Sequence, residues 1–182
     1  TVMAPKDENE LCDMLKTAVE FHGPISVRYP RGSGLGVEIA PELKVLPIGK
    51  AEVLRDGKDG CVWAIGTMVN TALKLSDKLQ EQGIELGVVN MRFAKPLDTE
   101  LLTEHANKYP KLITLEEGVL SGGVGGAVLE FLNTNGLLKV TEVLNLGIPD
   151  AYVPHGDKKL LLRDIELDDE AIANKVVAFL KG

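Results

Sequence analysis

The sequence has few aromatic residues and few cysteines. Phe, Trp and Tyr make up 4% of its 182 residues, so Val, Leu, Ile and Ala must fill the core that a hydrophobic content of 45% allows. Cys12 and Cys61 are the only cysteines, and both lie within apolar patterns. Two such thiols predict small core residues in a reducing compartment, and they argue against a disulfide framework or a metal site.

An excess of basic residues and a long apolar run are also absent. The 20 Lys and Arg residues are outnumbered by 27 Asp and Glu residues, which gives a net charge of −7. Nucleic acid is therefore disfavoured as a partner, because phosphate binding needs a basic stripe. No stretch approaches the roughly 20 apolar residues of a membrane span, and residues 1–6 lack the basic-then-apolar order of a signal peptide. We expect neither nucleic acid nor a membrane as a partner.

The common catalytic and metal-binding arrangements are missing as well. His22, His105 and His155 have no second His or Cys at the spacing of a metal site. There is no Gly-x-Ser-x-Gly elbow and no Cys–His pair that would activate a nucleophile. Only His155, in a loop before a predicted helix, is placed where a histidine could take part in chemistry.

From residue 49 onward, alternating strand and helix patterns predict an α/β domain. Short apolar runs predict strands at 61–65, 86–91, 111–115 and 140–146. Helical periodicity and capping residues, Thr67 among them, predict helices at 67–82, 98–106, 124–132, 157–163 and 168–180. The turn signal at 56–60 predicts that 51–55 pairs with 61–65 in a hairpin. The whole pattern predicts a mostly parallel sheet with helices on both faces, the fold class we assign.

The first 48 residues do not form a complete domain. Asp7 followed by Glu10 predicts a helix start, and an apolar stripe runs along that helix through Leu11, Met14, Leu15, Ala18 and Val19. A short strand is predicted at 25–29. One helix and one strand cannot bury their apolar faces alone. We therefore interpret 1–32 as the tail of a preceding α/β domain, 33–48 as a linker, and 49–182 as the complete domain.

The most informative element is Arg28-Tyr29-Pro30-Arg31-Gly32, which places two permanent cations just beyond the predicted strand. Ligands of open α/β sheets bind beyond the carboxyl ends of strands. The planar guanidinium fork matches phosphate oxygens two at a time. The element is therefore a candidate phosphate site. Two solvated arginines at a strand end remain the simpler interpretation.

Three further elements have a structural and a functional interpretation. The glycine-rich segment 118–127 lies before a predicted helix, but it fits neither the dinucleotide-binding fingerprint nor the P-loop, and we favour close packing of the helix. Glu116 and Glu117 should point to opposite faces of a strand, so we favour a salt bridge across an interface by one of them, with the other facing solvent, over paired catalysis. Arg92 and Lys95 stand at the same end of the sheet as Glu116. We expect an Arg–Glu pair there, with anion binding as the alternative.

These elements, in this order along the chain, resemble the 1-deoxy-D-xylulose-5-phosphate synthases. The resemblance rests on Arg28-Tyr29-Pro30-Arg31-Gly32 and on the run from Val89 to Asp98, and it is supported by further segments at 5–11, 46–51, 66–67, 116–117 and 144–150. The first two elements separate the chain from transketolases and from the β subunits of 2-oxoacid dehydrogenases, which share the architecture.

The resemblance implies that the chain is the C-terminal portion of a thiamine-diphosphate- and Mg²⁺-dependent transferase, namely the end of its pyrimidine-binding domain and its transketolase-type C-terminal domain. The family condenses pyruvate with glyceraldehyde 3-phosphate, releases CO₂, and feeds isoprenoid, thiamine and pyridoxal synthesis. The resemblance also implies a homodimer, in the cytoplasm or in the plastid stroma of a plant or alga. It assigns Arg31, with Arg28 as the alternative, to the phosphate of the acceptor sugar.

The family's residues for the diphosphate, for Mg²⁺, for activation of the pyrimidine ring and for proton transfer have no counterpart here. We therefore expect this segment to contain no catalytic, cofactor-binding or metal-binding residue, to be inactive by itself, and to work with the remainder of the same polypeptide. Two alternatives remain open. The chain could be a non-catalytic assembly module, or a β-type subunit of another thiamine-diphosphate enzyme.

Overall fold

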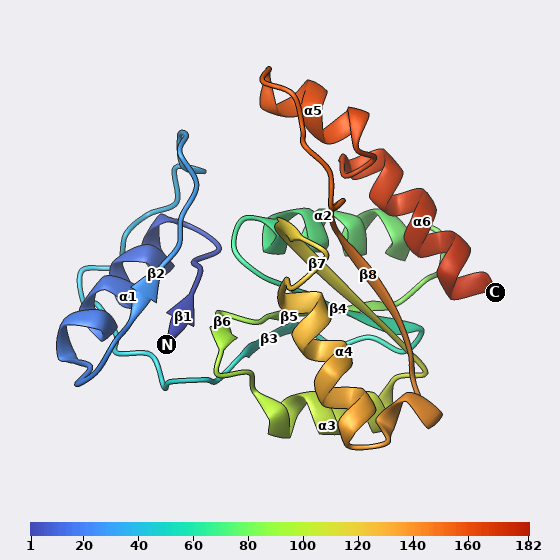
Figure 1. Cartoon of the computed structure of the whole chain (residues 1–182), viewed down its shortest axis with the longest axis horizontal. Coiled ribbons are helices and arrows are strands. Elements are labelled where there is room, and N and C mark those ends of the chain that lie inside the picture. The colour runs from blue at the N-terminus through green and yellow to red at the C-terminus, as the bar shows by residue number, and fades with distance from the viewer.

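The computed structural model describes residues 1–182, and its ribbon forms two lobes (Figure 1). The N-terminal lobe, residues 1–48, contains β1 (Val2–Met3), α1 (Glu8–Glu20) and β2 (Ser26–Val27). The C-terminal lobe, residues 49–182, contains the remaining helices and strands. Residues 28–51 form no helix or strand. None of the helices combines the length and apolar character needed to cross a bilayer.

The C-terminal lobe is built on a five-stranded sheet in the order β3-β5-β4-β7-β8. Its strands are β3 (Glu52–Arg55), β4 (Gly60–Ala64), β5 (Leu86–Asn90), β7 (Lys111–Val119) and β8 (Glu142–Ile148). β4, β5, β7 and β8 run parallel, and β3 joins β5 in the antiparallel sense. The predicted mostly parallel sheet is confirmed.

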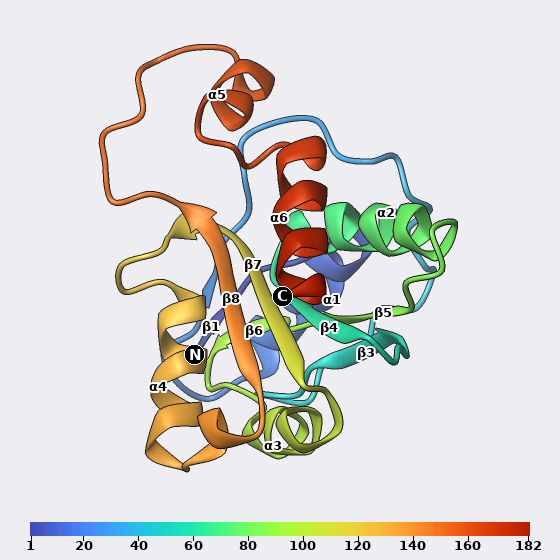
Figure 2. The ribbon, with the colours of Figure 1, turned by 90° about the vertical axis from the view of Figure 1, so that its right-hand side faces the viewer.

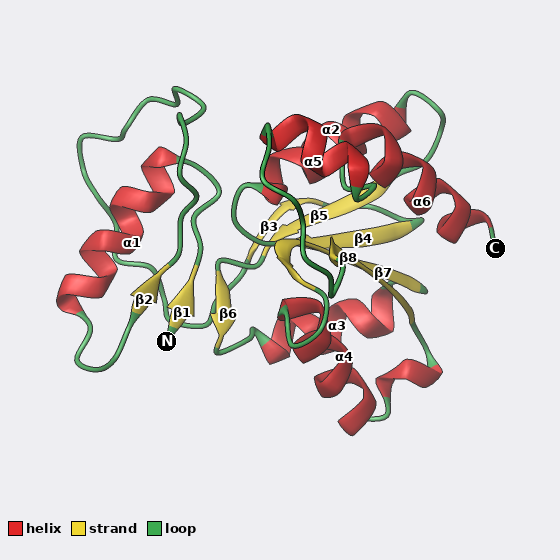
Figure 3. Cartoon of the chain, turned by 45° about the horizontal axis from the view of Figure 1, so that its top comes forward, coloured by secondary structure: helices red, strands yellow, loops and turns green.

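Helices cover both faces of this sheet (Figure 3). One face packs against α2 (Met68–Gln80) and α6 (Asp169–Lys181), and the other packs against α3 (Thr99–Lys108) and α4 (Val124–Thr134). Each face of the sheet has its own hydrophobic core. Because successive side chains of a strand point to opposite faces, Val62 belongs to the core under α2 and α6, and its neighbour Trp63 belongs to the core under α3 and α4. A short 3₁₀ turn, η1 (Leu137–Lys139), leads from α4 to β8, and α5 (Lys158–Asp164) projects from the lobe (Figure 2).

The predicted hairpin of 51–55 with 61–65 is wrong. β3 pairs with β5, which separates it from β4 in the sheet. The turn at 56–59 binds the chain just before β5, because the N–H groups of Lys58 and Asp59 donate to the carbonyl of Glu85 at 2.8 and 3.1 Å. β4 is buried along its whole length and takes two parallel neighbours, so the antiparallel strand is left at the edge.

The sequence patterns also missed a second, three-stranded sheet in the order β2-β1-β6. Its third strand, β6 (Phe93–Lys95), follows β5 and pairs antiparallel with β1. Met3, Met14, Leu46 and Phe93 bury their side chains together beside this sheet. The two lobes therefore share a sheet and a small core.

The predicted apolar stripe of α1 is only partly buried. The predicted helix start is confirmed, because the Asp7 side chain accepts a hydrogen bond from Glu10 N. Met14 is fully buried, but Leu15 is 48% exposed and Val19 is 86% exposed. One side of α1 therefore has nothing packed over it in this chain.

Candidate functional site

The Arg28-Tyr29-Pro30-Arg31-Gly32 element leaves β2 and passes between the two lobes. Arg28 continues the β-type pairing, because its N–H donates to Met3 O at 2.8 Å. Its guanidinium Nη2 donates to the carbonyl oxygen of Glu117 at 2.9 Å. Arg31 is exposed, and its side chain makes no hydrogen bond or ion pair within the chain. The two arginines thus differ, because Arg28 bridges the lobes and Arg31 is free.

Each arginine lines a different cavity. Arg28 borders a small cavity of about 140 Å³, whose wall also includes Glu116 and Glu117. Arg31 borders a larger cavity of about 460 Å³ between α1, the element itself and the start of α2, lined also by Lys6, Glu8, Thr67 and Asn70. The larger cavity has room for a small phosphorylated molecule, and Arg31 is a cation on its wall with no internal partner.

Glu116 occupies the glycine-rich helix start. It is 4% exposed, and its carboxylate oxygens accept the N–H groups of Val124 and Gly125 at 3.0 and 2.8 Å. These are the first N–H groups of α4, the kind of donors that would otherwise bind a phosphate. A diphosphate therefore does not fit this glycine-rich turn, because a carboxylate of the protein already fills it.

Glu117 points elsewhere, as adjacent strand residues must. Its carboxylate accepts the Thr67 hydroxyl at 2.9 Å and pairs with Lys158 Nζ at 2.6 Å. One of the two glutamates thus forms a salt bridge, as predicted, but within the C-terminal lobe and not across an interface. The expectation that the other faces solvent is wrong, because Glu116 is buried at the start of α4. Thr67 was predicted to cap α2, but its side chain makes no capping hydrogen bond.

The predicted role of the glycine-rich segment in packing is confirmed at Gly125. A Cβ atom at this position would lie 2.5 Å from Thr114 Oγ1 and 2.9 Å from Asn145 Cγ. Thr114 and Asn145 lie on β7 and β8 and are joined by a hydrogen bond of 2.7 Å. Glycine lets α4 approach these two strands closely.

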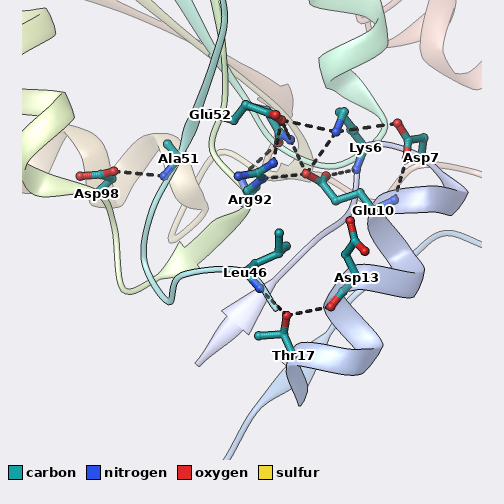
Figure 4. A network of polar contacts seen from close by, with 11 residues as sticks. Lys6, Asp7, Glu10, Asp13, Thr17, Leu46, Ala51, Glu52, Arg92 and Asp98 are labelled. Atoms are coloured by element: carbon teal, nitrogen blue, oxygen red, sulfur yellow. Dashed lines mark hydrogen bonds and ion pairs between the residues drawn. The ribbon is translucent and has the colours of Figure 1, made fainter. Parts of the chain in front are cut away.

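The expected pairing of Arg92 with Glu116 is wrong. Arg92 Nε lies 2.8 Å from Glu10 Oε1 on α1, and Arg92 Nη2 lies 2.9 Å from Glu52 Oε2 on β3 (Figure 4). Arg92 has a positive φ of 56°, which turns the chain between β5 and β6. Lys95 is exposed and makes no ion pair. Arg92 therefore joins the lobes, at a distance from the glutamates at the end of β7.

Glu10 is the centre of this network. It is 1% exposed and receives four donors: Lys6 N at 2.8 Å, Lys6 Nζ at 3.2 Å, Asn90 Nδ2 at 2.8 Å and Arg92 Nε at 2.8 Å. Burial raises the pKa of Glu10, but the charge of Lys6 and the hydrogen bonds outweigh that effect and bring its pKa below the usual range. The carboxylate is thus a charged bridge between the lobes. The sequence does not reveal this role, because the spacing of Asp7 and Glu10 indicates only a helix start.

The histidines do not form a site. His22 and His155 are exposed. His105 is 2% exposed, lies edge-on to Trp63 and Tyr109, and has Cys61 Sγ at 3.6 Å from its Nδ1. Burial lowers the pKa of His105 and raises that of Cys61. Both are therefore neutral core groups, as predicted for Cys61. The chain has no cluster of His, Cys, Asp and Glu that could hold a metal ion.

Comparison with known proteins defines the family. A family model described as "Transketolase, C-terminal domain" matches residues 49–172. The chain is 49% identical over 181 residues to 1-deoxy-D-xylulose-5-phosphate synthase 1 of Geobacter metallireducens and 54% identical over 160 residues to the synthase of Desulforudis audaxviator. These alignments cover 100% and 88% of this chain but 29% and 25% of those proteins. The chain thus spans little more than a quarter of the length of the curated relatives it matches.

Solved structures share the fold of this chain. A chain described as "Split gene transketolase, inactive beta4 tetramer" superposes with a TM-score of 0.87 at 32% identity, over 99% of this chain and 57% of that one. The transketolase of Campylobacter jejuni superposes with a TM-score of 0.64 at 19% identity, over 97% of this chain and 26% of that one, which shows a shared fold. With the matched family model and the strand order described above, these similarities lead to one conclusion: the chain belongs to the transketolase C-terminal domain family.

Proposed function

We propose that the chain is the C-terminal portion of a 1-deoxy-D-xylulose-5-phosphate synthase, and that it supplies the contact to the phosphate of the acceptor, glyceraldehyde 3-phosphate. Its other role is to join the domains of the enzyme and to form its homodimer. The near-50% identity to named synthases over the whole chain supports the family-level assignment. The reaction itself, which combines pyruvate with the acceptor and releases CO₂, belongs to the complete polypeptide.

One observation carries the assignment of the phosphate contact: Arg31 presents a guanidinium with no internal partner to the 460 Å³ cavity. A phosphate there would gain charge-assisted hydrogen bonds without breaking any contact of the folded chain. Arg28 is the second candidate, because its guanidinium already donates to Glu117 O. Both arginines sit near the join between the lobes, where parts of a larger active site would meet.

The cofactors of the proposed enzyme are thiamine diphosphate and Mg²⁺. When bound, thiamine diphosphate supplies the carbanion chemistry that pyruvate decarboxylation requires. The residues of this chain do not fit either group, because Glu116 fills the glycine-rich helix start and no metal-ligand cluster exists. We therefore assign the cofactor sites to the remainder of the polypeptide, and we assign no catalytic residue to residues 1–182.

The test is the acceptor specificity of the full-length enzyme carrying Arg31→Ala. We expect KM for glyceraldehyde 3-phosphate to rise about 10- to 100-fold, since hydrogen bonds to charged groups contribute about 1.5–3 kcal/mol. KM for unphosphorylated D-glyceraldehyde should stay unchanged. Arg28→Ala is the matched comparison and should have the smaller effect. If neither variant changes the preference for the phosphorylated acceptor, the proposed contact is wrong.

A β-type subunit of a two-chain thiamine-diphosphate enzyme is the second candidate. The similarity to the split-gene transketolase chain is the observation that favours it. A non-catalytic assembly module is the third. The reading frame upstream separates them: a diphosphate-binding Gly-Asp-Gly element supports the synthase, a pyrimidine domain alone supports the subunit, and a nearby stop codon supports the module.

A further inference from the structure

The linker is attached along one side of α1. Four backbone N–H groups of the linker donate to α1 side chains: Gly36 N to Glu8 Oε1 at 2.6 Å, Ala40 N to Asn9 Oδ1 at 2.7 Å, Lys44 N to Asp13 Oδ1 at 2.7 Å, and Leu46 N to Thr17 Oγ1 at 2.8 Å. Figure 4 shows the last of these contacts. The path of the chain that follows Arg31 is therefore set by polar side chains of α1.

Glu8 differs from the other three acceptors because it also lines the cavity of Arg31. Gly34 packs directly against the Glu8 carboxylate, where any Cβ atom would collide with it. Gly36, the donor, has a φ of 78°, a conformation that glycine adopts readily. The carboxylate of Glu8 therefore contacts the turn between Arg31 and Gly36 at two points, Gly34 and Gly36.

Backbone amides stabilise the charge of Glu8, which has no ion-pair partner. The N–H of Gly36 and the N–H of Glu8 itself lower the pKa of this carboxyl below its usual range, against a smaller opposing effect of burial, and the N–H of Leu35 adds to the lowering. Glu8 also lies in the first turn of α1, where the helix dipole favours a negative charge. It is therefore ionised, and its Oε1 accepts the hydrogen bond from Gly36 N, whereas its buried Oε2 has no hydrogen-bond partner.

We propose that Glu8 is a positioning residue for the acceptor phosphate: by holding the turn at Gly34 and Gly36, it fixes the backbone from which Arg31 reaches into the cavity. Glu8 itself does not touch the phosphate. This inference rests on the proposed function. It extends that function from the arginine to the helix that holds it.

The test uses the full-length enzyme with Glu8→Ala, Glu8→Asp and Glu8→Gln. Asp keeps the charge but is too short to reach Gly36 N, whereas Gln keeps an oxygen acceptor at the same reach. For Ala and Asp, KM for glyceraldehyde 3-phosphate should rise about tenfold, the factor expected for a lost hydrogen bond to a charged acceptor. Their kcat should stay within about twofold of wild type, because the chemistry is elsewhere. Gln should restore KM to near the wild-type value.

Two controls separate positioning from a general structural effect. Asn9→Ala removes a comparable contact, to Ala40 N, outside the cavity, and should leave KM unchanged. Unphosphorylated D-glyceraldehyde should show an unchanged KM with every variant. Should Glu8→Ala alter KM for both acceptors alike, or Asn9→Ala match it, Glu8 is structural and the inference is overturned. If Glu8→Ala does not fold, Glu8→Asp decides by the same criteria.

The two proposals fail in different ways. A normal KM for the phosphorylated acceptor in both Arg31→Ala and Arg28→Ala removes the phosphate contact of the proposed function. A raised KM in Arg31→Ala together with a normal KM in Glu8→Ala and Glu8→Asp removes only the positioning role. A KM that falls in Glu8→Gln would mean that the carboxylate repels the phosphate, and that result also contradicts the inference.

Discussion

At the scale of single residues, Gly125 shows how one missing side chain sets the distance between a helix and a sheet. It lies where α4 crosses β7 and β8, against the hydrogen-bonded pair Thr114 and Asn145. The neighbouring Gly126 has room for a Cβ atom, since the nearest atom would be Leu120 O, at an ordinary contact distance of 3.7 Å. The two glycines therefore form a natural pair of test and control.

We expect Gly125→Ala to lower the free energy of unfolding by about 1–3 kcal/mol, the usual cost of overpacking a tight core. Gly126→Ala should be neutral or stabilising by up to about 1 kcal/mol, because alanine favours helix over glycine. Urea unfolding followed by circular dichroism measures both values. Equal effects of the two substitutions would show that Gly125 has no special packing role.

At the scale of helices and strands, α1 is joined to the C-terminal lobe by the buried charge of Glu10. Removing one partner of a buried ion pair costs about 3–5 kcal/mol when the other partner is left without a counter-charge. Arg92 and Lys6 keep Glu52 as a second partner, so we expect Glu10→Gln to lower the free energy of unfolding by less than this, about 1–3 kcal/mol for the lost charge-assisted hydrogen bonds. The exposed pair of Lys58 and Glu85 is the control, and Glu85→Gln should have no measurable effect. Urea unfolding at pH 7 measures both.

The pH dependence of stability tests the charge of Glu10 independently. The pKa of Glu10 is lower in the folded chain than the value of about 4.3 in the unfolded chain. Its contribution is therefore complete above that unfolded value and is lost as the pH falls through the lower folded value. The wild-type and Glu10→Gln stabilities should differ at pH 7 and converge in acid. Parallel curves would contradict the charged bridge.

The same elements show what a sequence can and cannot predict. The parallel strands and their covering helices were predictable, because Val62-Trp63-Ala64-Ile65 and similar runs have a local pattern. The pairing of β3 with β5 was not, because a turn signal at 56–60 indicates a change of direction and does not say which strand lies alongside. Arg92 was placed at the correct end of the sheet, but its partner Glu10 is 82 residues away and comes from the other lobe.

At the scale of the whole molecule, two lobes share the small sheet β2-β1-β6, and our proposal assigns the cofactor sites to the remainder of the polypeptide. Isothermal titration of residues 1–182 with thiamine diphosphate and Mg²⁺ should give no binding at micromolar concentrations. The physical reason is that Glu116 already occupies the glycine-rich helix start. The full-length polypeptide is the positive control. Micromolar binding by residues 1–182 alone would refute this division of labour.

The attachment of the linker to α1 has a consequence for how this region can change over evolution. All four contacts use backbone amides of the linker, so they recognise no side chain there. Most substitutions between Ser33 and Leu46 are therefore tolerable, apart from changes at Gly34, Gly36 and the buried Leu46, and apart from proline at a donor position, which removes the N–H. An insertion or deletion, in contrast, would shift every later amide past its acceptor. Amino-acid substitutions should therefore accumulate in this segment during evolution, while its number of residues stays constant.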